Sequence, residues 1–87
     1  MHTISDHPAL SRLFRMQWEE AQGLYVLLYP EGMVKLSQSA AEILKRCDGR
    51  RTVSAIVDEL ELAFQCGGLR GDIEAFLRIA GERGWVM

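Results

Sequence analysis

The sequence has no hydrophobic run long enough to cross a membrane, which takes about eighteen or more consecutive apolar residues. Its first residues, 1–8, also have neither the basic start nor the apolar core of a secretory signal peptide. The sequence also lacks a large excess of charge of either sign, since 10 basic and 12 acidic residues leave a net charge of −2. A nucleic-acid-binding protein is expected to carry an excess of positive charge. We therefore expect a cytoplasmic protein that binds neither membrane nor nucleic acid.

Residues that commonly perform catalysis or bind metals are few. The 2 cysteines, Cys47 and Cys66, are too far apart for a zinc or redox pair, and the 2 histidines, His2 and His7, lie near the N-terminus. A catalytic nucleophile could therefore pair with a histidine only if the N-terminal end of the chain reached it. No glycine-rich phosphate loop follows a predicted strand. We predict no enzyme, no cofactor and no metal, with Cys47 in the core and Cys66 exposed.

The length of 87 residues predicts one small domain with a thin core. Residues 1–11 show no sustained hydrophobic periodicity, so they are predicted to be a flexible N-terminal arm. Residues 12–87 are predicted to form the single folded domain.

Two apolar segments joined by a tight turn form the centre of a predicted sheet. Residues 25–29 are apolar at successive positions, which is typical of a strand covered on both faces. Pro30 and Gly32 predict a three-residue turn with Gly32 at positive φ, leading into a short strand, residues 33–36. Residues 13–18 alternate and predict a half-buried strand. Short connections favour an antiparallel meander with residues 33–36 at an edge.

Three amphipathic helices follow the predicted strands. Ser37 or Ser39 can cap the first helix, and Ser39 and Glu42 have the spacing of a capping box. Thr52 is expected to cap the second, and the third is expected to begin near residues 71–72. The apolar stripes of the three helices are Ala40, Ile43, Leu44 and Cys47; Val53, Ile56, Val57, Leu60 and Phe64; and Ile73, Phe76, Leu77 and Ala80. The closing Trp85 and Val86 should fold back onto the core.

The predicted fold is therefore α+β and winged-helix-like, with a three-stranded antiparallel sheet followed by three helices. Winged helices often bind DNA, so a winged-helix DNA-binding protein is the alternative function. The charges of the third helix balance, however, and the basic cluster is small: Lys45, Arg46, Arg50 and Arg51. Binding driven by counterion release needs a larger positive excess. A purely structural subunit is a third possibility.

A short strand at a sheet edge can pair with a strand from another chain, and a helix beside it would make the second wall of a groove. The predicted peptide-binding residues are Met33, Val34, Lys35, Leu36, Ile73, Phe76, Leu77 and Ala80. The sequence leaves open which face of the strand lines the groove, and whether the helix residues only form core. If residues 33–36 form an edge, Val34→Pro should weaken peptide binding and retain much of the fold.

An ordered set of segments resembles the pyrroloquinoline quinone (PQQ) biosynthesis protein D family. Most of the resemblance lies in residues 29–36, 39–44 and 47–49, which read YPEGMVKL, SAAEIL and CDG. Gln17-Trp18, Ala21-Gln22 and residues 83–86 extend it over roughly residues 12–86.

The resemblance implies a RiPP recognition element, a module that binds the leader of a ribosomally made precursor peptide. For this family the peptide is PqqA, and the radical S-adenosylmethionine enzyme PqqE cross-links a Glu and a Tyr side chain of it. The family's groove, between the third strand and third helix, maps onto residues 33–36 and 73–80. This chain has no CxxxCxxC motif, so the iron–sulfur chemistry must belong to the partner. We expect a non-catalytic peptide chaperone, monomeric or swapped into a homodimer through the Gly67-Gly68 hinge.

Overall fold

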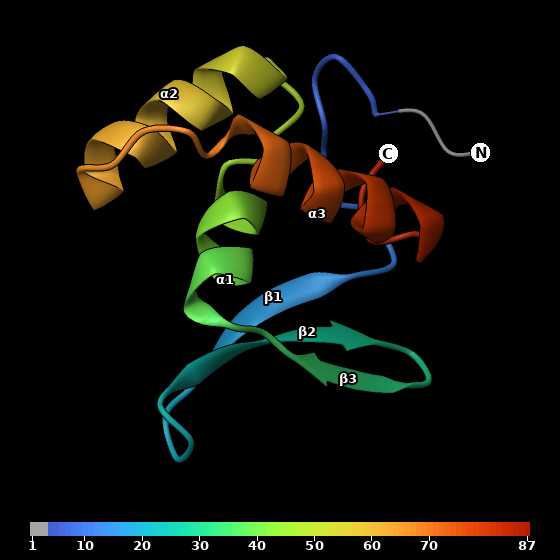
Figure 1. Ribbon diagram of the computed structural model, residues 1–87. Helices are drawn as coiled ribbons and strands as arrows, with labels where there is room; N and C mark the ends of the chain where they lie inside the picture. Colours follow the sequence, from blue (N-terminus) through green and yellow to red (C-terminus); the bar gives the residue numbers. More distant parts are fainter. Residues whose placement is uncertain (1–3) are drawn as a thin grey trace.

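In the computed structural model, which describes residues 4–87, three strands precede three helices. The elements are β1 (Arg15–Glu19), β2 (Leu24–Tyr29), β3 (Gly32–Lys35), α1 (Gln38–Lys45), α2 (Val53–Phe64) and α3 (Arg70–Glu82). The strand order is β1-β2-β3 with both pairs antiparallel, so the predicted α+β fold and meander are confirmed. Figure 1 shows the three helices gathered on one side of the sheet. Within residues 4–87, no helix has the length and apolar character that a membrane crossing requires.

The register of the sheet separates an inner face from an outer face. Met16, Leu27 and Val34 are aligned across the strands and belong to, or pack against, the helical core. Val26, in the next row, faces the other way between Gln17 and Lys35. It is buried although the helices lie on the inner side, because the sheet's central strand is flanked by long side chains. Helices therefore cover β2 on one face only, which differs from the expected two-sided cover.

The turn between β2 and β3 is tighter than the predicted three-residue turn. Tyr29 pairs with Gly32, so only Pro30 and Glu31 lie between the strands. Gly32 is the first residue of β3 and does not have a positive φ. The prediction of a three-residue turn was wrong because Pro30 and Glu31 complete the reversal by themselves.

Side-chain caps fix where the first two helices begin. The Ser37 hydroxyl accepts the N–H of Ala40 over 3.1 Å, and the Thr52 hydroxyl accepts the N–H of Ala55 over 3.0 Å. The Thr52 cap is confirmed. The capping box at Ser39 is not, since Ser39 already lies within α1. Gln65 ends α2 in the left-handed region at φ 54°.

The core lies between the inner face of the sheet and the three helices. Its central side chains, nearly inaccessible to solvent, include Leu27, Ile56, Leu60 and Leu77. The predicted helix stripes supply most of the core, and Trp85 and Val86 fold back onto it as expected. Phe64 is the exception, since it ends the α2 stripe and is 40% exposed.

Residues 8–11, within the segment predicted to be a flexible arm, pack against the domain. Pro8 is fully buried, and Ala9 and Met87 exchange main-chain hydrogen bonds of 3.1 and 2.9 Å. The N–H of Leu10 donates to the carbonyl oxygen of Cys47 over 3.0 Å. At Gly49, with φ 78°, a Cβ atom would lie 3.3 Å from the Ala9 side chain. Two distant segments thus offer main-chain partners to residues 9–10; residues 1–3, with His2, lie outside the described residues.

Candidate functional site

The edge strand β3 offers main-chain hydrogen-bonding groups to a further strand. The N–H of Leu36 donates to the carbonyl oxygen of Tyr25 over 2.9 Å. Because N–H and C=O directions alternate along an antiparallel strand, Val34 also faces β2, whereas Met33 and Lys35 face the open edge. The same alternation turns the side chains of Val34 and Leu36 toward the helices and those of Met33 and Lys35 toward the outer face.

The direction of the Val34 N–H group changes what the Val34→Pro variant tests. The N–H of Val34 belongs to the β2–β3 ladder, so a proline at this position would remove a bond that holds the sheet together. We therefore expect Val34→Pro to weaken the sheet itself, so that this variant does not separate peptide binding from folding. Lys35 is the position where proline removes an edge donor and leaves the ladder intact.

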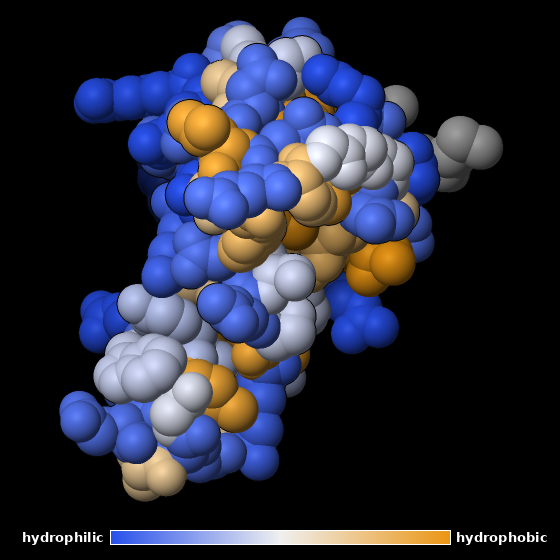
Figure 2. All heavy atoms as spheres, turned by 60° about the vertical axis from the view of Figure 1, so that its left-hand side comes forward, coloured by the Kyte–Doolittle hydropathy of each residue, from blue (hydrophilic) through white to orange (hydrophobic). Residues whose placement is uncertain are grey.

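An apolar groove of about 280 Å³ lies just beyond the end of β3, between the first turns of α1 and α3 and the last turn of α2. Its lining residues are Ser37, Ser39, Ala40, Ile43, Leu60, Phe64, Leu69, Asp72, Ile73 and Phe76. Phe64 and Phe76 supply its aromatic walls, and Ser37 and Asp72 its polar rim. Figure 2 shows hydrophobic surface gathered across the middle of this side of the molecule, between hydrophilic regions. We call this cavity the helical groove.

The eight sequence-predicted site residues divide among three places in the structure. Two of them line the helical groove: Ile73 and Phe76. Three others are buried in the core, Leu36, Leu77 and Ala80, and Ile73 is buried with them although it lines the groove. Three form the edge strand: Met33, Val34 and Lys35. Only Phe76 on α3 and the edge strand are therefore partly or fully accessible to a partner.

Sequence reasoning missed the contribution of α2 to the groove. Phe64 and Leu69, on either side of the Gly67-Gly68 connection, both line it. The periodicity of α2 placed Phe64 on the apolar stripe that faces the core. Periodicity does not show that the end of the helix extends past its neighbours, which leaves Phe64 partly exposed. The N–H of Leu69 donates to the Glu61 carboxylate over 3.0 Å, which fixes the connection beside the groove.

A second cavity, of about 320 Å³, lies on the other side of the α1 N-terminus. Trp18, 48% exposed, and Tyr25 meet edge to face there, with ring centroids 5.1 Å apart. The Lys45 ammonium lies 4.4 Å from the centre of the Tyr25 ring and 3.1 Å from the Glu42 carboxylate. These contacts raise the pKa of Lys45, chiefly through Glu42, and Arg46 and Lys45 together lower that of Glu42. We call this cavity the Trp18 pocket.

The basic cluster identified in the sequence is largely engaged by carboxylates. Arg46 pairs with Glu42 at 2.9 Å and with Glu59 at 3.3 Å. Arg51 pairs with Glu59 and with Asp48, both at 2.7 Å. The N–H groups of Arg51 and Arg50 donate to Asp48 and lower the pKa of its carboxyl group. This network links the end of α1 to α2 and leaves little unbalanced positive charge for a nucleic acid.

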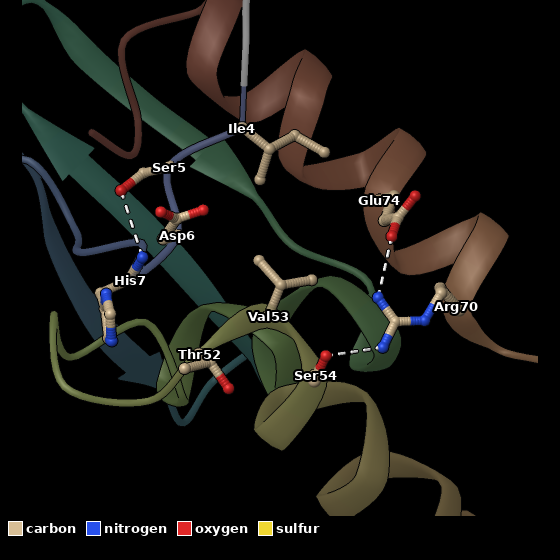
Figure 3. A pocket seen from close by; sticks show the side chains of 9 residues that line it. All are labelled: Ile4, Ser5, Asp6, His7, Thr52, Val53, Ser54, Arg70 and Glu74. Carbon is tan, nitrogen blue, oxygen red and sulfur yellow. Dashed lines mark hydrogen bonds and ion pairs between the residues drawn. The ribbon is translucent and has the colours of Figure 1, made fainter.

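A third cavity, of about 560 Å³, lies between residues 4–7 and the first turns of α2 and α3. Figure 3 shows the side chains that line it. Arg70 donates to Glu74 over 3.0 Å and to the Ser54 hydroxyl over 2.8 Å. His7 lies at the opposite side of the cavity from this pair (Figure 3). Within residues 4–87, no group of three or more His, Cys, Asp or Glu residues comes together to hold a metal.

The two cysteines differ in environment as expected. Cys47 is buried, and its thiol contacts the carbonyl oxygen of Ile43 at 3.3 Å. Burial raises the pKa of Cys47 to about 12, so the thiolate needed for nucleophilic attack is not formed near neutral pH. Cys66 is exposed in the connection between α2 and α3.

Comparison with known proteins agrees with this fold. The family model described as Coenzyme PQQ synthesis protein D (PqqD) matches residues 25–86. A protein of Stutzerimonas stutzeri named PqqA binding protein is 52% identical over 95% of this chain and 91% of its own length. One of the same name from Pseudomonas aeruginosa is 55% identical over 97% of this chain and 92% of its own.

A solved structure shares the whole fold. The NMR structure of the PqqD truncation of Methylobacterium extorquens PqqCD has a TM-score of 0.75 and 31% identity, covering 100% of this chain and 95% of that one. It is described as a functional and stand-alone RiPP recognition element. The role named for these relatives is binding, not catalysis. By family model, sequence identity and fold together, this chain belongs to the Coenzyme PQQ synthesis protein D family.

Proposed function

We propose that this protein is a non-catalytic chaperone of PQQ biosynthesis that binds the leader of the precursor peptide PqqA and presents it to the radical S-adenosylmethionine enzyme PqqE. The observation that carries the proposal is the open edge of β3 next to the apolar helical groove. Relatives more than half identical to this chain are named PqqA binding proteins, which supports PqqA as the ligand.

An extended leader segment pairs with β3 as a fourth strand. Met33 and Lys35 supply the N–H and C=O groups for this pairing, because theirs are the groups directed away from β2. Main-chain hydrogen bonds give affinity that depends little on sequence. β1 is the other edge of the sheet, but it lies two strands away from the groove side.

Selectivity for the leader comes from the helical groove. Beyond the C-terminal end of β3 the guest passes Ser37, where the groove opens. Phe64, Leu69 and Phe76 there receive an apolar leader side chain, while Asp72 and Ser37 meet polar groups at the rim. Of the predicted site, Phe76 and Ile73 act through this groove, and Leu77 and Ala80 support α3 from the core.

Presentation to the enzyme follows from holding only the leader. A leader bound to the edge strand leaves the core segment of the precursor outside the groove, where an enzyme can reach it. Tethering the reacting segment raises its effective concentration at the enzyme. Lys35 lies exposed at the edge and is placed to meet acidic leader residues.

Titration of fluorescently labelled PqqA into the protein tests the proposal. We expect saturable binding that depends only weakly on salt, and slower cross-linking by PqqE when this protein is omitted. Absence of peptide binding, both alone and with PqqE present, would refute it. A duplex DNA titration serves as the contrast, because DNA binding would weaken steeply with salt.

A further inference from the structure

The Trp18 pocket is a built cavity that the proposed peptide site does not use. Its floor is aliphatic, from Leu24, Leu36 and Ala41, and its wall is the Trp18–Tyr25 pair. Exposed Ser37 and Gln38 and the Glu42–Lys45 ion pair form a polar rim. An exposed aromatic centre surrounded by polar groups is the usual anatomy of a protein–protein hot spot.

The charges of the pocket select the kind of group that it receives. Its carboxylate, Glu42, and its ammonium, Lys45, pair with each other at 3.1 Å, so the lining offers no unbalanced charge. Lys45 also lies over the Tyr25 ring, which holds it at the wall. What remains for a partner is the exposed half of Trp18 and the aliphatic floor. An apolar or aromatic side chain of a partner protein fits this chemistry.

The position of the pocket indicates which partner it serves. Trp18 lies on β1, two strands from the open edge of β3, so a leader that extends the sheet does not run over it. Ser37 nevertheless lines both the helical groove and the Trp18 pocket. A protein seated on the Trp18 pocket would therefore lie beside the bound leader, with Ser37 at the boundary between them.

We propose that the Trp18 pocket is the docking site for the enzyme that modifies the bound peptide, which inserts an apolar or aromatic side chain between Trp18, Leu24 and Gln38. The inference rests on the proposed function, because a non-catalytic leader-binding chain needs a second surface to meet its enzyme.

The test measures two affinities for each variant of the full chain: for the precursor peptide alone, and for the modifying enzyme without peptide. Trp18→Ala should weaken enzyme binding about tenfold or more, the loss expected for an aromatic hot spot, and leave peptide affinity within about twofold. Gln38→Trp, which fills the mouth of the pocket from an exposed position, should have the same effect without removing any core contact. Leu62→Ala is the control, since Leu62 is 80% exposed on α2 and lines neither cavity.

Each outcome bears on one inference or the other. Enzyme affinity unchanged in both variants would overturn the docking site, and so would a parallel loss of peptide affinity, which would make the pocket part of the peptide site. If the unaltered chain binds the enzyme but not the precursor peptide, the proposed function is refuted. The enzyme affinities of the variants then still decide whether the Trp18 pocket is the docking site. Absence of any enzyme binding by the unaltered chain refutes the docking site directly.

Discussion

Leu36 donates its main-chain N–H to the carbonyl oxygen of Tyr25 over 2.9 Å, and this bond fixes which residues of β3 face the open edge. Val34, two residues before Leu36, faces β2 in the same way, whereas Met33 and Lys35 face outward. The main-chain groups of Val34 and Leu36 therefore hold β3 to β2, and those of Met33 and Lys35 are available to pair with a guest strand.

Lys35→Pro tests the edge directly. Proline removes one outward N–H donor and leaves the β2–β3 ladder intact, so the fold should persist while PqqA affinity falls about fivefold to tenfold, the worth of one hydrogen bond. Lys35→Ala keeps the N–H and is the matched control for the lost charge. Equal affinities of the two variants, measured by anisotropy titration, would rule out pairing at this donor.

Phe64→Ala tests the helical groove. Phe64 is 40% exposed and lines the groove, so its truncation should weaken peptide binding by about 1–2 kcal/mol with little change in thermal stability. Leu62→Ala, at an 80% exposed position on the same helix but outside the groove, should bind as the unaltered chain does. Calorimetric titration of both variants with PqqA measures the difference, and equal losses would remove Phe64 from the site.

Leu77→Ala tests the assignment of α3 residues to the core. Leu77 is nearly fully buried in the core cluster, and truncating such a leucine costs about 2–5 kcal/mol of unfolding free energy. Urea unfolding followed by circular dichroism measures it. Ile79→Ala, at an exposed position of the same helix, should change stability little. A stable Leu77→Ala variant with weakened peptide binding would instead assign Leu77 to the groove.

The carboxylates of the ion network predict a loss of stability in acid. Glu42 and Asp48 have lowered pKa values in the folded chain, through Arg46 and Lys45 and through the N–H groups of Arg51 and Arg50 respectively. A lowered folded pKa stabilises the fold above the ordinary carboxyl value of about 4 and ceases to do so as the pH falls through the folded pKa. Asp48 is exposed and Glu42 is half-buried at the surface, so screening by solvent keeps the effect small.

Asp48→Asn should therefore reduce the slope of unfolding free energy against pH below about 4. Asparagine can still accept the N–H bonds of Arg50 and Arg51, which preserves the turn while removing the charge. Glu31→Gln, at the exposed β2–β3 turn, is the control. Identical slopes for Asp48→Asn and the unaltered chain, in urea titrations at stepwise pH, would contradict the assignment.

The thiols predict a simple labelling result. Because Cys47 is buried with a pKa raised to about 12, only the exposed Cys66 should react with a thiol reagent near neutral pH in the native chain. Mass spectrometry should find one label per native chain and two after unfolding in denaturant. Rapid native labelling of Cys47 would show that the α1 core opens easily.

The sequence by itself determined the order of strands and helices, because each element carries its own periodicity and the first two helices also carry side-chain caps. The alternation before residue 19, the Thr52 cap and the i, i+3, i+4, i+7 stripes are local signals, and each led to the correct element. The family resemblance, which rests on the ordered segments and not on any one of them, was confirmed in the same way.

Only the tertiary structure decided which side chains reach a partner. Periodicity marked Phe64, Phe76 and Leu77 alike as apolar, but burial depends on whether another element covers each one, and that is not a local property. The ladder phase of β3 likewise depends on its pairing with β2, and the packing of residues 8–11 depends on main-chain partners at Cys47 and Met87. The Trp18 pocket arises only because α1 returns beside β1 and β2, bringing distant segments around one cavity.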